Sequence, residues 1–204
     1  MADQEQPQIY LISPPELDPE GFPEQLARVL DAREIACFRL ALASTDEDHV
    51  ARAADACRAT CHERDVAIVI AQHQRMVERL GLDGVHLDGA RAIRDARKEL
   101  GEDAIVGTFC GASRHDGMNA AEAGADYVAF GPVGQTELGD GTRAELDLFS
   151  WWSEVIEIPI VAEGALTPEL VGAISPVTDF FGIGSEIWKS DDPVAALASL
   201  LEQA

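Results

Sequence analysis

The sequence predicts a single closed (β/α)8 barrel, a TIM barrel, as one domain over residues 1–204. Short apolar runs recur along the chain, and each is followed by a segment with helical spacing of its apolar residues. The runs are almost continuously hydrophobic, as is typical of parallel strands that are buried on both faces. Strands and helices alternate without a doubled strand or a linker, which favours a closed barrel.

The expected strands are short, and polar or glycine-containing segments separate them from the helices. They cover Ile9–Ser13, Ile35–Leu42, Val66–Ala71, Gly84–Leu87, Ile105–Cys110, Tyr127–Gly131, Ile160–Ala162 and Phe180–Ile183.

The expected helices fill the intervals between these strands and follow the last one. They cover Phe22–Ala32, Asp46–Arg64, Gln74–Leu80, Ala90–Leu100, His115–Ala123, Leu146–Val155, Pro168–Ile174 and Pro193–Leu201. Thr167-Pro168 and Asp192-Pro193 each place a capping residue before a proline in the first turn.

The alternative architecture is a doubly wound open sheet. That fold usually carries G-x-G-x-x-G after its first strand, whereas here the first strand leads into Ser13-Pro14-Pro15-Glu16. In a barrel, binding and catalytic residues lie where the strands end, so the strand ends supply the candidate site residues.

The charge balance excludes two classes of partner. The chain has 37 acidic and 15 basic residues, for a net charge of -22. Such a surface repels nucleic acid and anionic membranes at long range, so we expect neither as a partner. An anionic substrate therefore needs a local site built from backbone N–H groups and a few arginines.

The cysteines and the start of the chain indicate a reducing compartment. No signal peptide is recognisable in residues 1–9, and the longest apolar runs are too short to span a membrane. We therefore expect a cytoplasmic protein whose four cysteines are free thiols in the core. Cys57 and Cys61 lie four apart but have too few neighbouring ligands for a metal site.

The last two strands point to a phosphate site. Glycine lets the backbone approach an anion, and the loops after the seventh and eighth strands often hold phosphate in barrels of this kind. Gly164, Gly184 and Ser185 are the candidates, and Glu163 ends the seventh strand beside them.

The loop after the fifth strand offers charge and proton transfer. Arg114 is able to pair with phosphate oxygens, and His115 is a candidate for proton transfer. Ser113 serves either as a helix cap or as a ligand. Whether the side chains of Arg114 and His115 face the site or the solvent stays open at this point.

Other strand ends add polar groups. The glycine-rich stretch Gly131–Thr142 is the longest loop, and it is interpreted as a lid that carries Thr136 or as an irregular turn. The fourth strand contains His86, which is either catalytic or a hydrogen-bonded core residue, and Gln72 directly follows the third strand.

Three segments together resemble the thiamine phosphate synthase and thiazole tautomerase family over nearly the whole chain. They are Asp83-Gly84-Val85-His86-Leu87, Gly124-Ala125-Asp126-Tyr127-Val128-Ala129-Phe130-Gly131-Pro132 and Pro159-Ile160-Val161-Ala162-Glu163-Gly164. The resemblance implies a transferase of thiamine biosynthesis that joins a pyrimidine pyrophosphate to a thiazole phosphate and releases pyrophosphate with Mg²⁺.

The chain departs from the family pattern at the polar positions. Arg39-Leu40-Ala41-Leu42-Ala43 stands where the family has Q-x-R-x-K, and Ala71-Gln72 replaces Asn-Asp. Arg91 stands at the position of the family's metal-binding Asp, and Thr136-Glu137-Leu138-Gly139 keeps one Thr of T-x-T-K without the lysine. From these residues we assemble no metal site.

Several functions remain open on the sequence alone. The first is the synthase, with Mg²⁺ as cofactor and with Arg39, Arg114 and Arg143 replacing the lost basic groups. The second is a metal-free thiazole-phosphate isomerase that uses His115, His86 or Glu163. The others are a non-catalytic barrel that binds a phosphorylated metabolite and, more remotely, a phosphosugar isomerase. Trp151 and Trp152 leave a homo-oligomer open as well.

Overall fold

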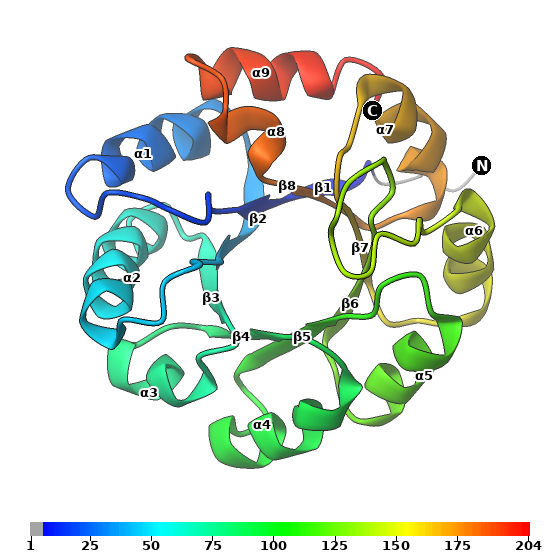
Figure 1. Cartoon of the computed structure of the whole chain (residues 1–204), viewed down its shortest axis with the longest axis horizontal. Coiled ribbons are helices and arrows are strands. Elements are labelled where there is room, and N and C mark those ends of the chain that lie inside the picture. Colours follow the sequence, from blue (N-terminus) through cyan, green and yellow to red (C-terminus); the bar gives the residue numbers. More distant parts are fainter. Residues whose placement is uncertain (1–5) are drawn as a thin grey trace.

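The computed structural model describes residues 6–204 and forms a closed, all-parallel barrel with the strand order β1 to β8 (Figure 1). The strands are β1 Gln8–Ile12, β2 Ile35–Leu40, β3 Ala67–Ala71, β4 Gly84–Leu87, β5 Ile105–Phe109, β6 Tyr127–Phe130, β7 Ile160–Glu163 and β8 Phe180–Ile183. The predicted (β/α)8 class is confirmed. That residues 1–204 form one domain stays a prediction, because residues 1–5 lie outside the described part of the chain.

The helices form a ring outside the strands. They are α1 Phe22–Ala32, α2 Glu47–His62, α3 Val77–Leu80, α4 Ile93–Leu100, α5 Arg114–Glu122, α6 Leu146–Val155, α7 Pro168–Ile174, α8 Ser185–Trp188 and α9 Pro193–Leu200, with short 3-10 turns at Gln74–Met76, Ala90–Ala92 and Ser175–Val177. The short α8 was not predicted, and the expected helices at Gln74 and Ala90 begin as 3-10 turns.

Local sequence fixes several of the helix starts. The side chains of Asp46, Ser113, Thr167 and Asp192 accept backbone N–H bonds at the starts of α2, α5, α7 and α9. These bonds satisfy N–H groups that have no partner within the helix. The two predicted Thr-Pro and Asp-Pro starts are therefore confirmed.

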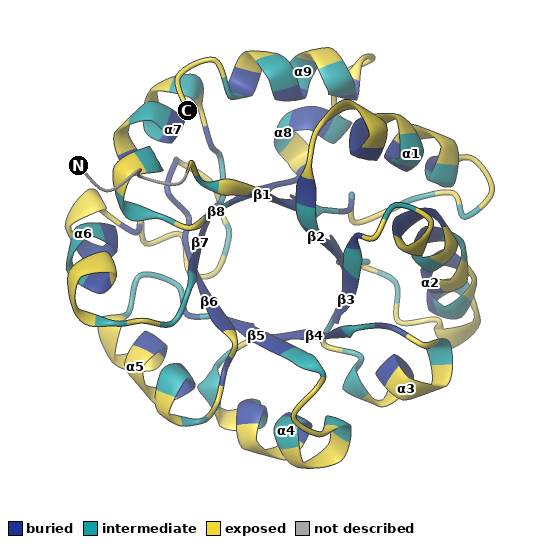
Figure 2. Cartoon of the chain, turned by 180° about the vertical axis from the view of Figure 1, so that it is seen from behind, coloured by how far each residue is buried: buried dark blue, intermediate teal, exposed yellow. Residues whose placement is uncertain are grey.

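The apolar core lies between the strands and the surrounding helices, and Figure 2 shows the buried strands encircled by helices that are exposed on their outer faces. The largest fully buried side chains include Trp152, Phe38 and Phe130. All four cysteines are free and buried, which confirms their predicted role in packing. Among the described residues, no helix has the length and hydrophobicity needed to cross a membrane.

Candidate active site

The barrel interior holds a connected set of polar side chains, which we call the interior network: Tyr10, Arg39, His86, Tyr127 and Glu163. They come from β1, β2, β4, β6 and β7, and each is at most 7% exposed. Gly107 makes room for this set, because a Cβ atom there would lie 2.0 Å from the Tyr127 ring. Strands that are far apart in sequence thus converge on one buried polar cluster.

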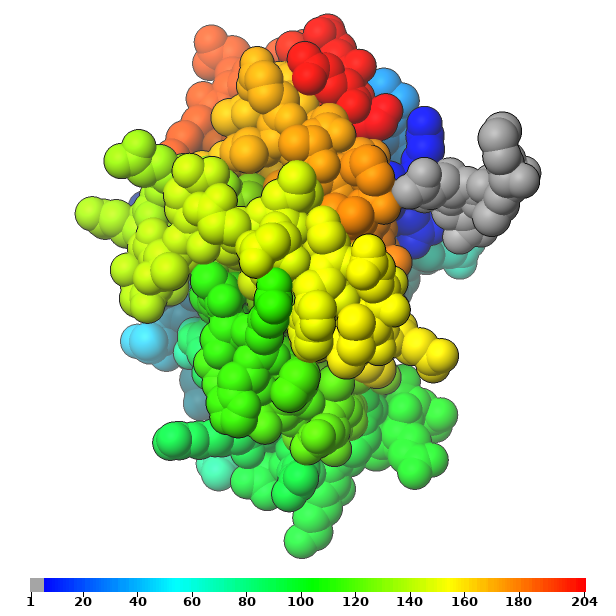
Figure 3. All heavy atoms as spheres, turned by 90° about the vertical axis from the view of Figure 1, so that its right-hand side faces the viewer, coloured from blue at the N-terminus to red at the C-terminus, as the bar shows by residue number. Residues whose placement is uncertain are grey.

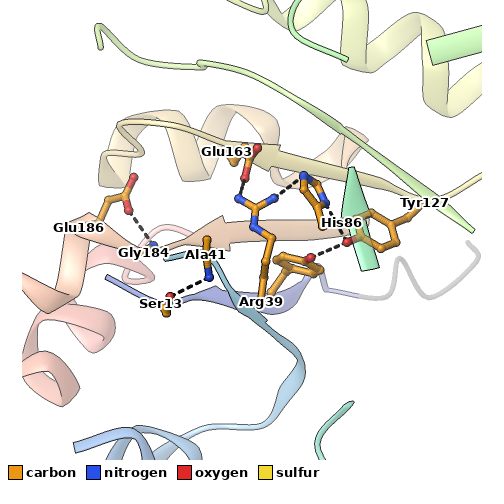
Figure 4. Close-up of polar contacts among 9 residues, drawn as sticks. Ser13, Arg39, Ala41, His86, Tyr127, Glu163, Gly184 and Glu186 are labelled. Carbon is orange, nitrogen blue, oxygen red and sulfur yellow. Dashed lines mark hydrogen bonds and ion pairs between the residues drawn. The ribbon is translucent and has the colours of Figure 1, made fainter. Parts of the chain in front are cut away.

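Arg39 is at the centre of the interior network (Figure 4). Its Nη2 donates to Glu163 Oε2 at 2.5 Å, and its Nη1 lies 2.7 Å from His86 Nε2. Burial alone lowers the pKa of the Arg39 guanidinium, but the Glu163 carboxylate and the tyrosines outweigh it and raise that pKa above its ordinary value. Arg39 is therefore charged and is held by its partners.

The hydrogen bonds assign a tautomer to His86. A guanidinium only donates, so Nε2 of His86 accepts from Arg39. Nδ1 then carries the proton and donates to the Tyr127 hydroxyl at 2.9 Å, and that hydroxyl bonds Tyr10 Oη at 2.5 Å. Burial, and then the charge of Arg39, lower the pKa of His86 well below its ordinary value, so the imidazole stays neutral.

The loops after β7 and β8, which carry Gly164, Gly184 and Ser185, meet at the C-terminal end of the barrel. That these three residues bind phosphate stays a prediction. The carboxylate of Glu186 joins the two loops, because Oε1 accepts from Leu166 N–H at 3.1 Å and Oε2 from Gly184 N–H at 2.8 Å. We call these two N–H groups the anion cup. Two backbone donors from separate loops already bind one negative group there.

The loop after β6 covers the β7 loop. The N–H groups of Val133 and Gly134 donate to Gly164 O at 3.1 and 2.9 Å. A Cβ atom on Gly164 would lie 2.9 Å from Leu138. The yellow-green loop lies over β7 in Figure 1 and projects at the left edge of Figure 3. Its tip is exposed at Thr136, so whether this residue binds a ligand stays a prediction.

A groove of about 1010 Å³ opens beside the loops after β4 and β5. His115 and Ser113 line it, with Asp88, Arg91 and Arg94. Ser113 Oγ caps α5 by accepting from Asp116 N–H at 3.1 Å, and His115 bonds Asn119 at 3.1 Å. The structure therefore brings His115 and Ser113 to the same groove, but not to the interior network.

Arg114 lies on the outer surface, and Gln72 contacts a residue at the edge of this groove. The Arg114 guanidinium pairs with Asp147 at 3.0 Å and stacks on Trp151 at 5.0 Å, on the outer surface. Gln72 is exposed, and its amide donates to the carboxylate of Asp88. Neither side chain is joined to Gly164, Gly184 or the interior network by a contact described in the structure.

The Mg²⁺ that the resemblance implies finds no ligand set in the described residues. No group of three or more His, Cys, Asp or Glu side chains is placed there to hold a metal ion. Asp88, the nearest carboxylate to the family's metal position, already accepts from Gln72. A hard cation needs several oxygen ligands, so these side chains do not fit a protein-held Mg²⁺.

Sequence reasoning missed Tyr10, Tyr127 and Glu186 as site residues. Tyr127 stands inside the segment that carries the family resemblance, and Glu186 directly follows the candidate Ser185. Both residues could therefore have been proposed as site residues from the sequence motifs. Tyr10 gave no signal, because an aromatic residue in a buried strand is ordinary.

The comparisons with known proteins agree with this geometry. The solved structure described as "Thiamine phosphate pyrophosphorylase from Pyrococcus furiosus Pfu-1255191-001" superimposes with a TM-score of 0.83 at 21% identity, covering 95% of this chain and 93% of that one. This likeness establishes the class of fold, a (β/α)8 barrel.

The sequence comparisons give the family. The sequence pattern of the family described as "Thiamine monophosphate synthase" matches residues 9–178. Proteins named thiamine-phosphate synthase are 41% identical in Erythrobacter litoralis (strain HTCC2594), covering 97% of this chain and 96% of theirs, and 39% identical in Rhodospirillum centenum (strain ATCC 51521 / SW), covering 93% and 94%. The chain belongs to the thiamine monophosphate synthase family, which confirms the resemblance.

Proposed function

We propose that this protein is a thiamine-phosphate synthase of thiamine biosynthesis, which joins a thiazole phosphate to a pyrimidine pyrophosphate in the cytoplasm. The observation that carries the proposal is the anion cup, where Leu166 N–H and Gly184 N–H converge at the C-terminal end of the barrel. In a member of this family, such a pair of donors suits the phosphate of the thiazole substrate.

The second substrate brings a pyrophosphate that must leave. The carbon–oxygen bond to pyrophosphate breaks, and the leaving group takes the electron pair, so negative charge develops on it. Cations placed at the leaving oxygens stabilise this charge. Among the arginines, Arg39 is bound by Glu163 and Arg114 by Asp147, whereas Arg143 donates to the Val133 carbonyl.

Arg91 and Arg94 are better placed for this task. Both are exposed, and both line the groove beside the loops after β4 and β5. Arg91 stands at the family's metal position, so we propose that a guanidinium binds pyrophosphate directly where other members hold a cation. An arginine presents several donors in a fixed plane that matches phosphate oxygens.

The test is product formation from the two substrates in Mg²⁺-containing buffer, with wild type and Arg91→Ala compared. We expect thiamine phosphate from the wild type, and a rise of roughly tenfold or more in the KM for the pyrimidine pyrophosphate in Arg91→Ala, the worth of one charge-assisted hydrogen bond. Arg79→Ala, exposed on α3 away from the groove, is the matched control. No product from the wild type at high enzyme concentration would refute the synthase, and an unchanged KM in Arg91→Ala would remove Arg91 from the site.

A further inference from the structure

Glu186 binds both donors of the anion cup in the free protein (Figure 4). The bond to Gly184 is local, but the bond to Leu166 joins the carboxylate to a loop 20 residues earlier in the chain. Figure 4 shows the Glu186 side chain turned toward Gly184. One acidic side chain therefore holds the ends of two neighbouring loops together.

The backbone on the Leu166 side is shaped for this contact. Gly164 has a φ of 93°, and Ala165 has a φ of 53°, in the left-handed region. A residue with a Cβ atom reaches that region only at an energetic cost, which a compensating contact must offset. The N–H bond from Leu166 to Glu186 comes directly after this strained residue.

A carboxylate and a phosphate cannot occupy the anion cup together. Each N–H group is already donated to a Glu186 oxygen, and the two anions would repel each other at contact distance. An entering phosphate must therefore move the Glu186 side chain. Glu186 is partly exposed, so it has solvent to move into.

We propose that Glu186 is an intramolecular anion that fills the anion cup until the phosphate of a substrate displaces it. This inference rests on the proposed function, because it takes the cup as the phosphate site. A site that is open only part of the time binds every anion more weakly, by the fraction of time that it is open. Free inorganic phosphate then binds weakly, whereas a substrate phosphate enters with the help of contacts to the rest of its molecule.

The experiment measures inorganic phosphate binding, by calorimetry, to wild type, Glu186→Ala and Glu186→Gln. We expect Glu186→Ala to bind phosphate about tenfold or more tightly than wild type, since the competitor is gone. Glu186→Gln keeps an acceptor oxygen but loses the charge, so its affinity should lie between the two. Asp191→Asn, an exposed position just beyond α8, removes the same charge as a control and should match the wild type.

A thermal melt supplies a second measurement. Without phosphate, Glu186→Ala should melt below wild type because Leu166 N–H and Gly184 N–H lose their acceptor, and added phosphate should restore its melting temperature while hardly changing that of wild type. Equal phosphate affinity in wild type and both variants, or no binding by any of them, would overturn the inference. Should Glu186→Ala fail to fold, Glu186→Gln decides by the same comparison.

The outcome is separable from that of the proposed function. Phosphate binding needs no turnover. Tighter phosphate binding by Glu186→Ala, without thiamine phosphate formation by wild type, would therefore retain the inference and refute the synthase. Turnover by wild type, with equal phosphate affinity in wild type and the Glu186 variants, would retain the synthase and refute the inference.

Discussion

At the scale of single residues, the buried pair of Arg39 and Glu163 shows the competition between desolvation and attraction. Both side chains are at most 8% exposed, so each charge has lost its water. Such a pair is not in itself a large gain in stability, but removing one partner leaves the other charge buried and unpaired. His86 adds to the cost, because a neutral ring beside Arg39 cannot neutralise it.

We predict that Glu163→Gln lowers the free energy of unfolding by about 3 kcal/mol, since it leaves Arg39 charged in the barrel interior. Urea unfolding of the purified variant measures this. The double variant Arg39→Met with Glu163→Gln should regain a large part of the loss, because the buried charge is then gone. Equal losses in the single and double variants would show that the unpaired charge is not the cause.

The sequence indicated several residues of the interior network but not the hydrogen bonds between them. His86 and Glu163 stand at strand ends inside the resembling segments, and Arg39 stands in the altered Q-x-R-x-K position. Their contacts span 47 and 124 residues of sequence, and no local pattern encodes them. The direction in which the Arg114 side chain points could not be predicted either, because helical spacing does not say which face of the first turn meets the barrel.

At the scale of elements, an aspartate directly precedes three of the eight strands. Asp83, Asp126 and Asp179 come directly before β4, β6 and β8, and each carboxylate accepts a backbone N–H near the start of the preceding strand. The accepting distances are 2.7, 2.7 and 2.8 Å. Asp83 and Asp126 belong to the segments that carry the family resemblance, so part of that resemblance records how strands begin rather than catalysis.

We predict that Asp126→Ala lowers the free energy of unfolding by about 2 kcal/mol, because Val106 N–H loses its acceptor at the start of β5. Arg97, which donates to the same carboxylate at 2.6 Å, loses a partner as well. Chemical denaturation measures the loss. Asp103→Ala, exposed at the same end of β5, is the control and should change stability by less than about 0.5 kcal/mol. Similar values for both variants would refute the capping role.

The elements also show what the sequence could and could not predict. Every strand was found, because apolar runs buried on both faces stand out from their surroundings. The helix α8 was not found, since Ser185–Trp188 is too short to show a helical period. It follows the β8 loop directly and carries Glu186, so the missed element is the one that fills the anion cup.

At the scale of the whole molecule, the core retains several protons that the unfolded chain would release in alkali. Burial raises the pKa of the thiols of Cys37, Cys57 and Cys110 from 9.0 to about 12, and it raises that of Cys61 further. Burial, with weaker contributions from its neighbours, also raises the pKa of Tyr10 and Tyr127. All these groups are neutral in the folded protein near pH 9 and above.

The sign of the pH dependence follows from proton counting. Above pH 9 the unfolded thiols lose their protons while the folded ones keep them, so stability falls as pH rises toward 12, by about 1.4 kcal/mol per pH unit for each group. Urea unfolding midpoints should therefore decrease steeply between pH 8 and pH 11. Cys57→Ala removes one such thiol, so its free energy of unfolding should fall less steeply with pH, by about the 1.4 kcal/mol per pH unit that one group contributes. A midpoint that stays constant over this range would mean that the thiols ionise equally in both states.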